Sequence, residues 1–222
     1  MTYSLKDAPQ SVMRIKFCGF RRAQDVQAAV AVGVDAIGLV FYPPSPRSVD
    51  VSLAQTLVAH IPAFVSIVAL VVNISDDELI HIANTVPFDV IQFHGDESAS
   101  ECQRQAALVG KRWIKALRID ASRHDAQAIT QMVNEYHAKG AVSILLDAYH
   151  ADKFGGTGER FDWSIIPEHA SLPIILAGGL TPENVALTKR LPIHAVDVSG
   201  GIESAKGVKD IGKMQAFIAA VR

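Results

Sequence analysis

The chain has 222 residues, of which 49% are hydrophobic and 20% are charged, and its formal net charge is -2. This composition excludes a disordered chain, and the near-neutral charge gives no support for nucleic-acid binding, which needs a basic surface. Aromatic residues make up only 7%, while valine, isoleucine, leucine and alanine are abundant, as in strands that are buried on both faces.

The beginning of the chain and its cysteines narrow the class of protein further. Residues 1–12 lack the apolar segment of a secretory signal and predict a flexible, solvated extension, followed by one folded domain over residues 13–222. The longest apolar run, 63–72, falls far short of the roughly 18 residues of a membrane span. Cys18 and Cys102 have neither a CxxC partner nor metal-ligand spacing. We therefore expect a cytoplasmic protein with reduced thiols and no metal site.

Short apolar, β-branched runs alternate along the chain with stretches of helical periodicity. The runs begin about 26 residues apart, near Arg14, Asp35, Phe64, Asp89, Arg112, Ser143, Pro173 and Ala195. Ser75, followed by three acids, and Thr181, followed by proline, are typical helix N-caps. Eight strand–helix units in one chain of this length predict a single-domain (β/α)8 TIM barrel. In such barrels the chemistry lies where strands end, so the search narrows to the loops that follow the strands.

The first two strands end in candidate functional residues. Lys16 and Cys18 of the KFCG segment share a strand face, which points into the barrel if Ile15 and Phe17 face the helices. Cys18 is then either a functional thiol whose pKa Lys16 lowers, or a small buried hydrophobe. Arg47 follows the second strand in a loop stiffened by three prolines. It is a candidate ligand of a substrate carboxylate or phosphate, the alternative being a plain surface arginine.

The fourth, fifth and sixth strands also end beside residues that can do chemistry. His94 shares a strand face with Gln92 and can donate a hydrogen bond, act as acid or base, or order its loop, while Asp96 suits helix capping. Lys115 is either a Schiff-base lysine or an interior lysine paired with an acid from a neighbouring strand. Asp147 ends an apolar run and is a candidate general acid or base.

Glycines follow the last three predicted strands. The segment 155–158 is either a loop that closes over a ligand or a plain loop. Paired glycines follow the seventh and eighth strands, where barrels commonly bind phosphate through backbone amides. The predicted phosphate ligands are Gly178, Gly179, Ser199, Gly200 and Gly201. Asp197, near the end of the eighth strand, is a further candidate substrate ligand, together with Arg47 and His94.

In order along the chain, these segments resemble the phosphoribosylanthranilate isomerase family from about Met13 to the C-terminus. The segments are KFCG, FYPPSPRSV, QFHGDE, LLDA with GGTG, AGGLTPENV and DVSGGIE. The resemblance implies an Amadori rearrangement of N-(5-phosphoribosyl)anthranilate in tryptophan biosynthesis, with no metal or organic cofactor. It implies Cys18 as general base, Asp147 as general acid and Arg47 as ligand of the anthranilate carboxylate. It also implies a small-molecule substrate and a monomer or weak homodimer.

This chemistry makes electrostatic demands on the site. The acid must start protonated and the base deprotonated, which reverses their ordinary order of pKa. We therefore expect burial to raise the pKa of Asp147 and positive surroundings to depress the pKa of Cys18. We also expect positive character to be local, with glycine-loop amides at one end of the pocket and Arg47 at the other. Gly200 stands where the family often has serine, which bears on a side-chain contact to phosphate but not on backbone contacts.

Four other functions fit this sequence less well. A ribulose-phosphate type of epimerase needs a cluster of histidine and aspartate metal ligands, whereas His94 stands alone at a strand end. A Schiff-base aldolase needs Lys115 in place of Cys18. A silent barrel that binds a sugar phosphate as a regulator has no need for an acid–base pair such as Cys18 and Asp147. The barrel isomerase of histidine biosynthesis is expected to use two acids, so Cys18 favours the tryptophan route.

Overall fold

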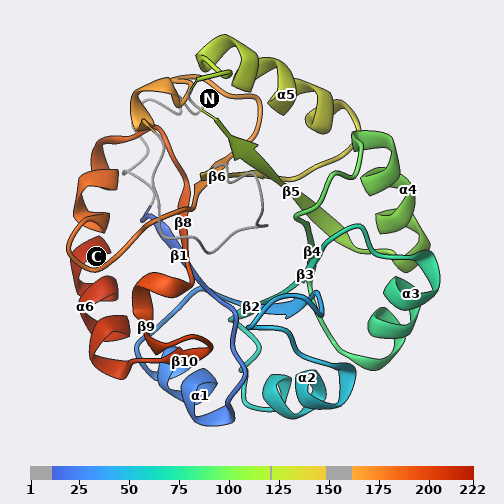
Figure 1. Cartoon of the computed structure of the whole chain (residues 1–222), viewed down its shortest axis with the longest axis vertical. Helices are drawn as coiled ribbons and strands as arrows, with labels where there is room; N and C mark the ends of the chain where they lie inside the picture. Colours follow the sequence, from blue (N-terminus) through green and yellow to red (C-terminus); the bar gives the residue numbers. More distant parts are fainter. Residues whose placement is uncertain (1–11, 121, 149–161) are drawn as a thin grey trace, which may run out of the picture.

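The computed structural model describes residues 12–120, 122–148 and 162–222, and it shows a closed barrel (Figure 1). Eight parallel strands pair in the order β1 to β8, and β8 closes the ring by pairing with β1. The helices form an outer ring around the strands. The predicted (β/α)8 TIM barrel is therefore confirmed, and every predicted strand begins within two residues of an observed one.

The barrel strands are β1 (Arg14–Cys18), β2 (Ala36–Phe41), β3 (Ser66–Val71), β4 (Val90–Phe93), β5 (Arg112–Ile119), β6 (Ile144–Ala148), β7 (Ile174–Leu176) and β8 (Ala195–Val198). The α-helices are α1 (Ala23–Ala31), α2 (Val51–Val58), α3 (Asp76–Thr85), α4 (Ala99–Val109), α5 (Ala126–Ala138) and α6 (Ile211–Val221). Shorter elements are the 3-10 helices η2 (Trp163–Ile165), η3 (Val185–Arg190) and η4 (Gly200–Ile202), and the antiparallel pair β9 (Glu203–Ala205) and β10 (Val208–Lys209).

Helix starts agree only in part with the sequence. Ser75 caps α3 as predicted, and Glu78 bonds back to the Ser75 amide in a capping box. Ser98, rather than Asp96, caps α4. The helix expected from Thr181 begins later, as the 3-10 helix η3. Before it lies a turn in which Asn184 accepts from the Thr181 amide and donates to Gly179 O.

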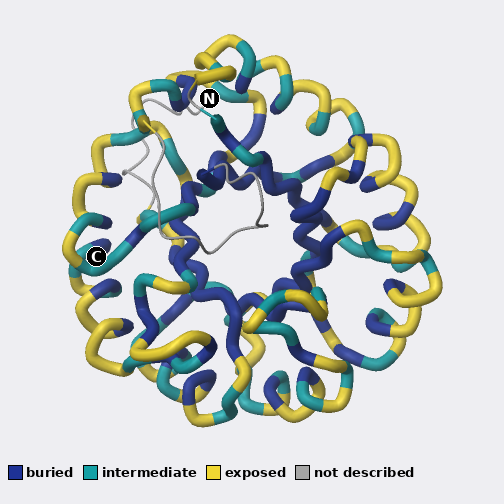
Figure 2. Tube along the Cα trace, viewed as in Figure 1, coloured by how far each residue is buried: buried dark blue, intermediate teal, exposed yellow. Residues whose placement is uncertain are grey.

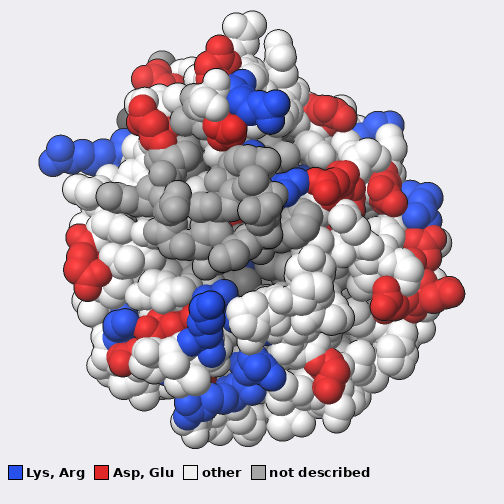
Figure 3. Space-filling view, viewed as in Figure 1, with Lys and Arg blue, Asp and Glu red and all other residues white. Residues whose placement is uncertain are grey.

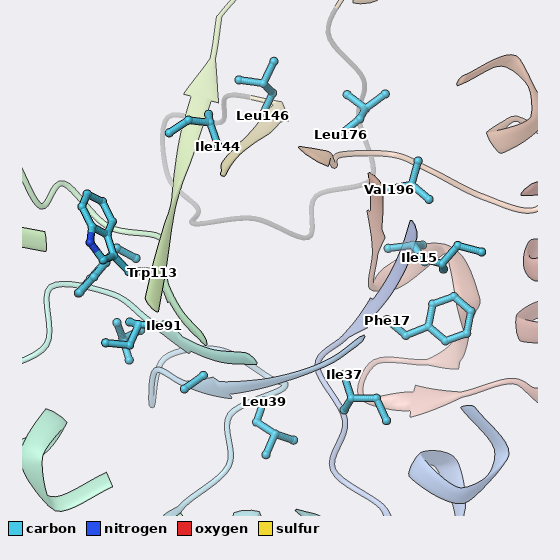
Figure 4. Close-up of a cluster of buried hydrophobic side chains, with 14 of the residues drawn as sticks. Ile15, Phe17, Ile37, Leu39, Ile91, Trp113, Ile144, Leu146, Leu176 and Val196 are labelled. Carbon is cyan, nitrogen blue, oxygen red and sulfur yellow. The ribbon is translucent and has the colours of Figure 1, made fainter. Parts of the chain in front are cut away.

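The apolar face of the barrel wall points outward, toward the helices. Figure 4 shows these side chains directed away from the barrel centre: Ile15, Phe17, Ile37, Leu39, Ile91, Trp113, Ile144, Leu146, Leu176 and Val196. Each such buried side chain contributes roughly 1.5–3 kcal/mol. The strands are buried over most of their length, apart from exposed first residues such as Arg14, Ser66 and Arg112, whereas the helices are buried mainly where they face the strands (Figure 2). Because the outward face supplies this core, the inward face can carry polar side chains.

Two predictions concern segments that lie largely or wholly outside the described residues. The extension of residues 1–12 lies outside the described residues apart from Val12, which is exposed, and the glycine segment 155–158 also lies outside them. Within the described ranges, no helix is both long enough and apolar enough to span a membrane.

Candidate active site

The end of β1 presents a lysine and a thiol to the barrel interior, as strand alternation predicted. Lys16 Nζ donates to Asp197 Oδ1 at 2.9 Å, and the two residues are register partners across the β1–β8 seam. Cys18 is 4% exposed and packs with Val40 of β2, Leu70 of β3 and Val72, which directly follows β3. Asp197, a predicted substrate ligand, is thus placed as the buried partner of Lys16.

A glycine of β2 makes room for this pair. A Cβ atom on Gly38 would lie 2.6 Å from Cys18 Sγ and 3.1 Å from Lys16 Nζ, distances that real Cβ contacts scarcely allow. Sequence reasoning missed Gly38. The signal was present, because a glycine inside an apolar strand often marks a close approach of another group.

A second buried lysine approaches the thiol from β10. Lys209 Nζ donates to Cys18 O at 2.6 Å, to Ser199 O at 3.2 Å and to Glu203 Oε1 at 2.9 Å. Ser199 Oγ also donates to Cys18 O, at 3.0 Å. The end of β1 is therefore tied both to the loop after β8 and to the β9–β10 pair. Sequence reasoning did not find Lys209, because nothing in the local pattern shows that this hairpin folds back onto β1.

The environment of Cys18 does not depress its pKa. Burial raises the pKa of the thiol and outweighs the opposing effect of Lys16, while Asp197 raises the pKa further and Lys209 lowers it. The expectation of a depressed thiol pKa is therefore wrong. Burial opposes the charge of Lys16 too, but Asp197 and Cys18 outweigh it and raise the pKa of Lys16, which keeps an ammonium group beside the sulfur.

Arg47 forms a two-bond ion pair with Glu203. Nε donates to Oε1 at 2.8 Å and Nη2 to Oε2 at 2.7 Å. This uses one edge of the guanidinium, so the edge formed by Nη1 and the outer hydrogen of Nη2 is left for another acceptor. Burial opposes the charge of Glu203, but Arg47 and Lys209 outweigh it and hold the pKa of Glu203 below its ordinary value.

Arg47 also lies against the loop that follows β8. A Cβ atom on Gly200 would lie 3.4 Å from Arg47 Nη2, and one on Gly19 would lie 2.5 Å from Arg47 Cδ. The expectation that Arg47 stands at the opposite end from this glycine loop is therefore wrong. The physical reason is Glu203, which follows the loop and draws the guanidinium toward it. Glu203 lies in the DVSGGIE segment, but nothing in that local pattern indicates that it pairs with Arg47.

Asp147 faces His94 across the inner surface of the barrel. Asp147 Oδ1 accepts from the Ala148 amide at 2.9 Å, and Oδ2 lies 3.3 Å from His94 Nε2. The other ring nitrogen of His94, Nδ1, lies 3.0 Å from Gln92 Nε2. All three side chains are buried. The structure thus brings His94, a predicted substrate ligand, together with the predicted general acid.

The two predicted phosphate loops pack against each other. Gly178 and Gly179, directly after β7, have φ angles of 83° and 61°, which favour glycine. A Cβ atom on Gly178 would lie 2.9 Å from Asp147 Oδ1, and one on Gly201 would overlap Leu180 O. Close backbone packing of this kind needs glycine, and it places all five predicted phosphate ligands in adjoining loops.

Lys115 is held in an ion pair on the outer side of the barrel wall. Its Nζ donates to Glu97 Oε2 at 2.9 Å and to Gly95 O at 2.6 Å. Lys115 is thus paired with an acid, as one reading predicted, but the acid lies in the loop after β4 rather than on a strand, and the pair lies outside the barrel interior. The Schiff-base alternative has no support. In the described part of the chain, no three histidine, cysteine, aspartate or glutamate side chains gather as metal ligands.

Positive charge is local on the face seen in Figure 3. Lysine and arginine side chains gather near β9, β10 and the start of α1, whereas acidic side chains are scattered around the rim. The near-neutral net charge thus coexists with a basic region beside the Arg47–Glu203 pair.

Comparison with known proteins gives consistent matches over almost the whole chain. A family model described as N-(5'phosphoribosyl)anthranilate (PRA) isomerase matches residues 15–220. An N-(5'-phosphoribosyl)anthranilate isomerase of Pseudomonas fluorescens is 51% identical over 211 residues, which is 95% of this chain and 96% of the relative.

Two of the solved structures that resemble this chain are also phosphoribosylanthranilate isomerases. A phosphoribosyl anthranilate isomerase in complex with reduced 1-(o-carboxyphenylamino)-1-deoxyribulose 5-phosphate is 28% identical, with a TM-score of 0.76, and the match covers 94% of this chain and 98% of that one. A structure of monomers generated from the dimeric enzyme of Thermotoga maritima matches with the same identity, TM-score and coverage.

Proposed function

We propose that this chain, which belongs to the N-(5'-phosphoribosyl)anthranilate isomerase family, catalyses the Amadori rearrangement of tryptophan biosynthesis. The substrate is N-(5-phosphoribosyl)anthranilate and the product is 1-(2-carboxyphenylamino)-1-deoxyribulose 5-phosphate. One observation of the geometry supports this most: the same barrel interior holds a thiol between two buried lysines and a carboxyl group that faces a buried histidine. An acid and a base are what the rearrangement requires.

The first step is ring opening by Asp147. Because Oδ1 accepts the Ala148 amide, the proton of the acid sits on Oδ2. Oδ2 gives that proton to the ring oxygen of the sugar while the bond from this oxygen to C1′ breaks. The lone pair of the anthranilate nitrogen forms a C=N bond to C1′, which leaves a protonated imine.

The second step is removal of the C2′ proton by the Cys18 thiolate. The C–H electron pair forms the C1′=C2′ bond and neutralises the imine, which gives an enolamine. The enolamine becomes the ketone when C1′ gains a proton and the C2′ hydroxyl loses one. Since burial raises the pKa of Cys18, the thiolate depends on the cations around it, namely Lys16, Lys209 and the protonated imine itself.

Substrate binding uses both ends of the ligand. The unoccupied edge of the Arg47 guanidinium receives the anthranilate carboxylate, and the loops with Gly178, Gly179, Ser199, Gly200 and Gly201 receive the phosphate. Asp197 acts through Lys16 rather than on the substrate. No step needs a metal or an organic cofactor.

We further propose a cytoplasmic protein that is a monomer or weak homodimer. Both cysteines are free thiols, which suits a reducing compartment. Large exposed hydrophobic side chains are dispersed along the described chain: Val12, Phe64, Ile80, Leu108, Leu187 and Ile211. Sedimentation analysis over a range of concentrations tests this, and a dimer that persists at nanomolar concentration would contradict it.

A direct assay tests the activity. Phosphoribosylanthranilate is generated in situ, and loss of its anthranilate fluorescence is followed with purified protein. We expect turnover by the wild type, and kcat at least about 100-fold lower in Cys18→Ser and in Asp147→Asn, the usual share of a general acid or base. Cys102→Ala is the matched control, because Cys102 lies in the outer core and not in the site. Absence of wild-type turnover would contradict the isomerase function. Near-normal kcat in both variants would contradict only the acid–base assignment.

A further inference from the structure

The side chain of Lys209, on β10, is fully buried beside the end of β1. Its Nζ atom donates to Cys18 O at 2.6 Å, to Ser199 O at 3.2 Å and to Glu203 Oε1 at 2.9 Å. Burial lowers the pKa of Lys209, yet these three oxygens match the three N–H donors of an ammonium group. The lysine therefore joins the end of β1, the loop after β8 and the start of β9, which lie far apart in the sequence.

Contacts at both ends fix this lysine in place. The hairpin of β9 and β10 lies beside α1 (Figure 1), and the Lys209 amide donates to Asp25 Oδ2 of that helix at 3.0 Å. Lys209 Nζ lies 5.4 Å from the centroid of the Phe20 ring, a distance at which a cation is attracted to the face of an aromatic ring. Since both its backbone and its ammonium group are anchored, Lys209 holds the groups that it binds in fixed positions.

Glu203 extends this connection to Arg47. Its Oε1 accepts from Lys209 Nζ and from Arg47 Nε, and its Oε2 accepts from Arg47 Nη2 at 2.7 Å. Arg47 also packs against the backbone just after Cys18, where a Cβ atom on Gly19 would lie 2.5 Å from Arg47 Cδ. The left-handed backbone of Gly19, with a φ of 81°, is open to this approach because glycine has no side chain. The two candidate functional residues are thus connected through the buried ion pair as well as through direct packing.

The proposed reaction requires a fixed spacing between these two residues. In phosphoribosylanthranilate, covalent bonds set the distance between the C2′ proton, which Cys18 removes, and the carboxylate, which Arg47 receives. Reacting atoms must lie about 3–3.5 Å apart, and a misplacement of about 1 Å can lower the rate about 100-fold. A carboxylate held by Arg47 therefore brings the C2′ proton within reach of the thiolate only if Cys18 keeps its place relative to Arg47.

We propose that Lys209 is a positioning residue that keeps Cys18 at the spacing from Arg47 that the substrate requires, and this rests on the proposed function. Lys209 acts on the base through its hydrogen bond to Cys18 O, and on the carboxylate ligand through Glu203. Without Lys209, Cys18 O still accepts from Ser199 Oγ, but that bond ties it only to the loop after β8. Arg47 keeps both of its bonds to Glu203. Loss of Lys209 thus releases the base and leaves the carboxylate ligand in place.

Steady-state kinetics of Lys209→Met tests this, with the fraction of competent sites measured by fluorescence titration with the product. We expect kcat per competent site to fall about 10- to 100-fold, while KM stays within about threefold of the wild-type value. Lys206→Met, an exposed lysine in the turn between β9 and β10, is the matched control and should change neither.

Glu203→Gln should show the opposite pattern. Its amide oxygen still accepts from Lys209, while Arg47 loses its charged partner, so KM should rise about tenfold and kcat stay within about threefold. If the ion pair of Lys209 and Glu203 only stabilised the fold, both variants would change kcat and KM in the same way. The same pattern in both variants would therefore overturn the proposal.

The pH dependence separates positioning from a purely electrostatic effect. Lys209 also lowers the pKa of Cys18, so an electrostatic effect alone would leave less thiolate in Lys209→Met. The deficit in kcat would then shrink as the pH rises and the thiol ionises. We expect instead that the ratio of wild-type to variant kcat changes by less than about threefold between about pH 7 and pH 9. A ratio that falls toward one would overturn the proposal, and so would a near-normal kcat per competent site.

A second variant and the wild type complete the experiment. If Lys209→Met does not fold, Lys209→Gln replaces it, since it keeps N–H donors on a shorter side chain, and kcat should fall at least about fivefold with KM within about threefold. Wild-type turnover in the same assay tests the isomerase function separately. An inactive wild type would contradict that function and this proposal with it, whereas an active wild type without the expected split would overturn the proposal alone.

Discussion

At the scale of single residues, the main feature is the Cys18 thiol, whose ionisation burial opposes and neighbouring lysines favour. Burial works against the thiolate of Cys18, and two buried lysines work for it. Lys16 is held by Asp197, and Lys209 by Glu203 and three backbone or side-chain oxygens of Cys18 and Ser199. Asp197 and Cys18 raise the pKa of Lys16, whereas burial lowers the pKa of Lys209, so Lys16 is the cation that stays charged beside the sulfur as the thiol ionises.

The reaction of Cys18 with iodoacetamide should show how this ionisation depends on pH. A raised pKa means that the thiolate appears only above the ordinary range near pH 8.5, so the alkylation rate should still be rising there. Lys16→Met should lower the rate at a given pH, because it leaves Asp197 uncompensated near the sulfur. Peptide mass spectrometry separates Cys18 from Cys102, which lies in the outer core and whose pKa burial raises to about 12. A half-maximal rate at or below the pH of free cysteine would contradict this.

Replacement of Glu203 should weaken substrate binding. Glu203→Gln keeps the shape of the side chain but removes the charge that fixes the Arg47 fork. We expect KM to rise about tenfold while kcat stays within about threefold, because Arg47 contributes mainly uniform binding. Glu101→Gln, an exposed acid of α4, is the matched control in steady-state kinetics. An unchanged KM in Glu203→Gln would mean that Glu203 does not position Arg47.

At the scale of elements, the side chains of β1 require a glycine in the neighbouring strand β2. β2 pairs with β1 so that Gly38 is the register partner of Cys18. Cys18 and Lys16 occupy the space that a side chain at position 38 would need. The strand β2 thus makes room for the candidate site by having glycine at this position.

Gly38→Ala should therefore impair both stability and activity. The added Cβ must displace the thiol or the lysine, and overpacking of this kind costs about 1–3 kcal/mol. We expect a lower free energy of unfolding in urea and kcat reduced at least about tenfold. Gly212→Ala, in α6, is the matched control, because alanine is the better helix former. Normal kcat in Gly38→Ala would show that the site tolerates movement of Cys18.

The elements also show what the sequence could and could not predict. Alternation in β1 correctly placed Lys16 and Cys18 inside, because a strand face follows from local spacing. Glu203 and Lys209 escaped prediction, because their contacts join residues 156 and 191 positions apart and depend on how a late hairpin folds back. The α-helix expected at Thr181 was wrong: a turn braced by the Asn184 side chain leads there into the 3-10 helix η3.

At the scale of the whole molecule, buried ion pairs as well as strand pairing connect the first and last parts of the barrel. Lys16–Asp197 spans the β1–β8 seam in the interior, and Arg47–Glu203–Lys209 joins the loop after β2 to the last hairpin. A buried charge that loses its partner is costly, so these contacts link the stability of the fold to pH.

The stability contributed by Glu203 should disappear in acid. Its pKa is lowered in the folded protein, so the contribution is complete above the unfolded value near 4.5 and is lost as pH falls through the folded value. We expect the wild type to melt at a higher temperature than Glu203→Gln at about pH 6, and the difference to shrink toward about pH 3. Calorimetry of both proteins measures this. A difference that stays constant over this range would show that the charge of Glu203 does not stabilise the fold.

The seam between the first and last strands has a consequence for biosynthesis. Cys18 leaves the ribosome well before Asp197 and Lys209, which hold Lys16 and the backbone of Cys18. During most of translation the thiol is therefore an ordinary cysteine in an open chain, without the burial that later suppresses its ionisation. Its protection from oxidants and its catalytic setting arrive together, when the final strand closes the ring.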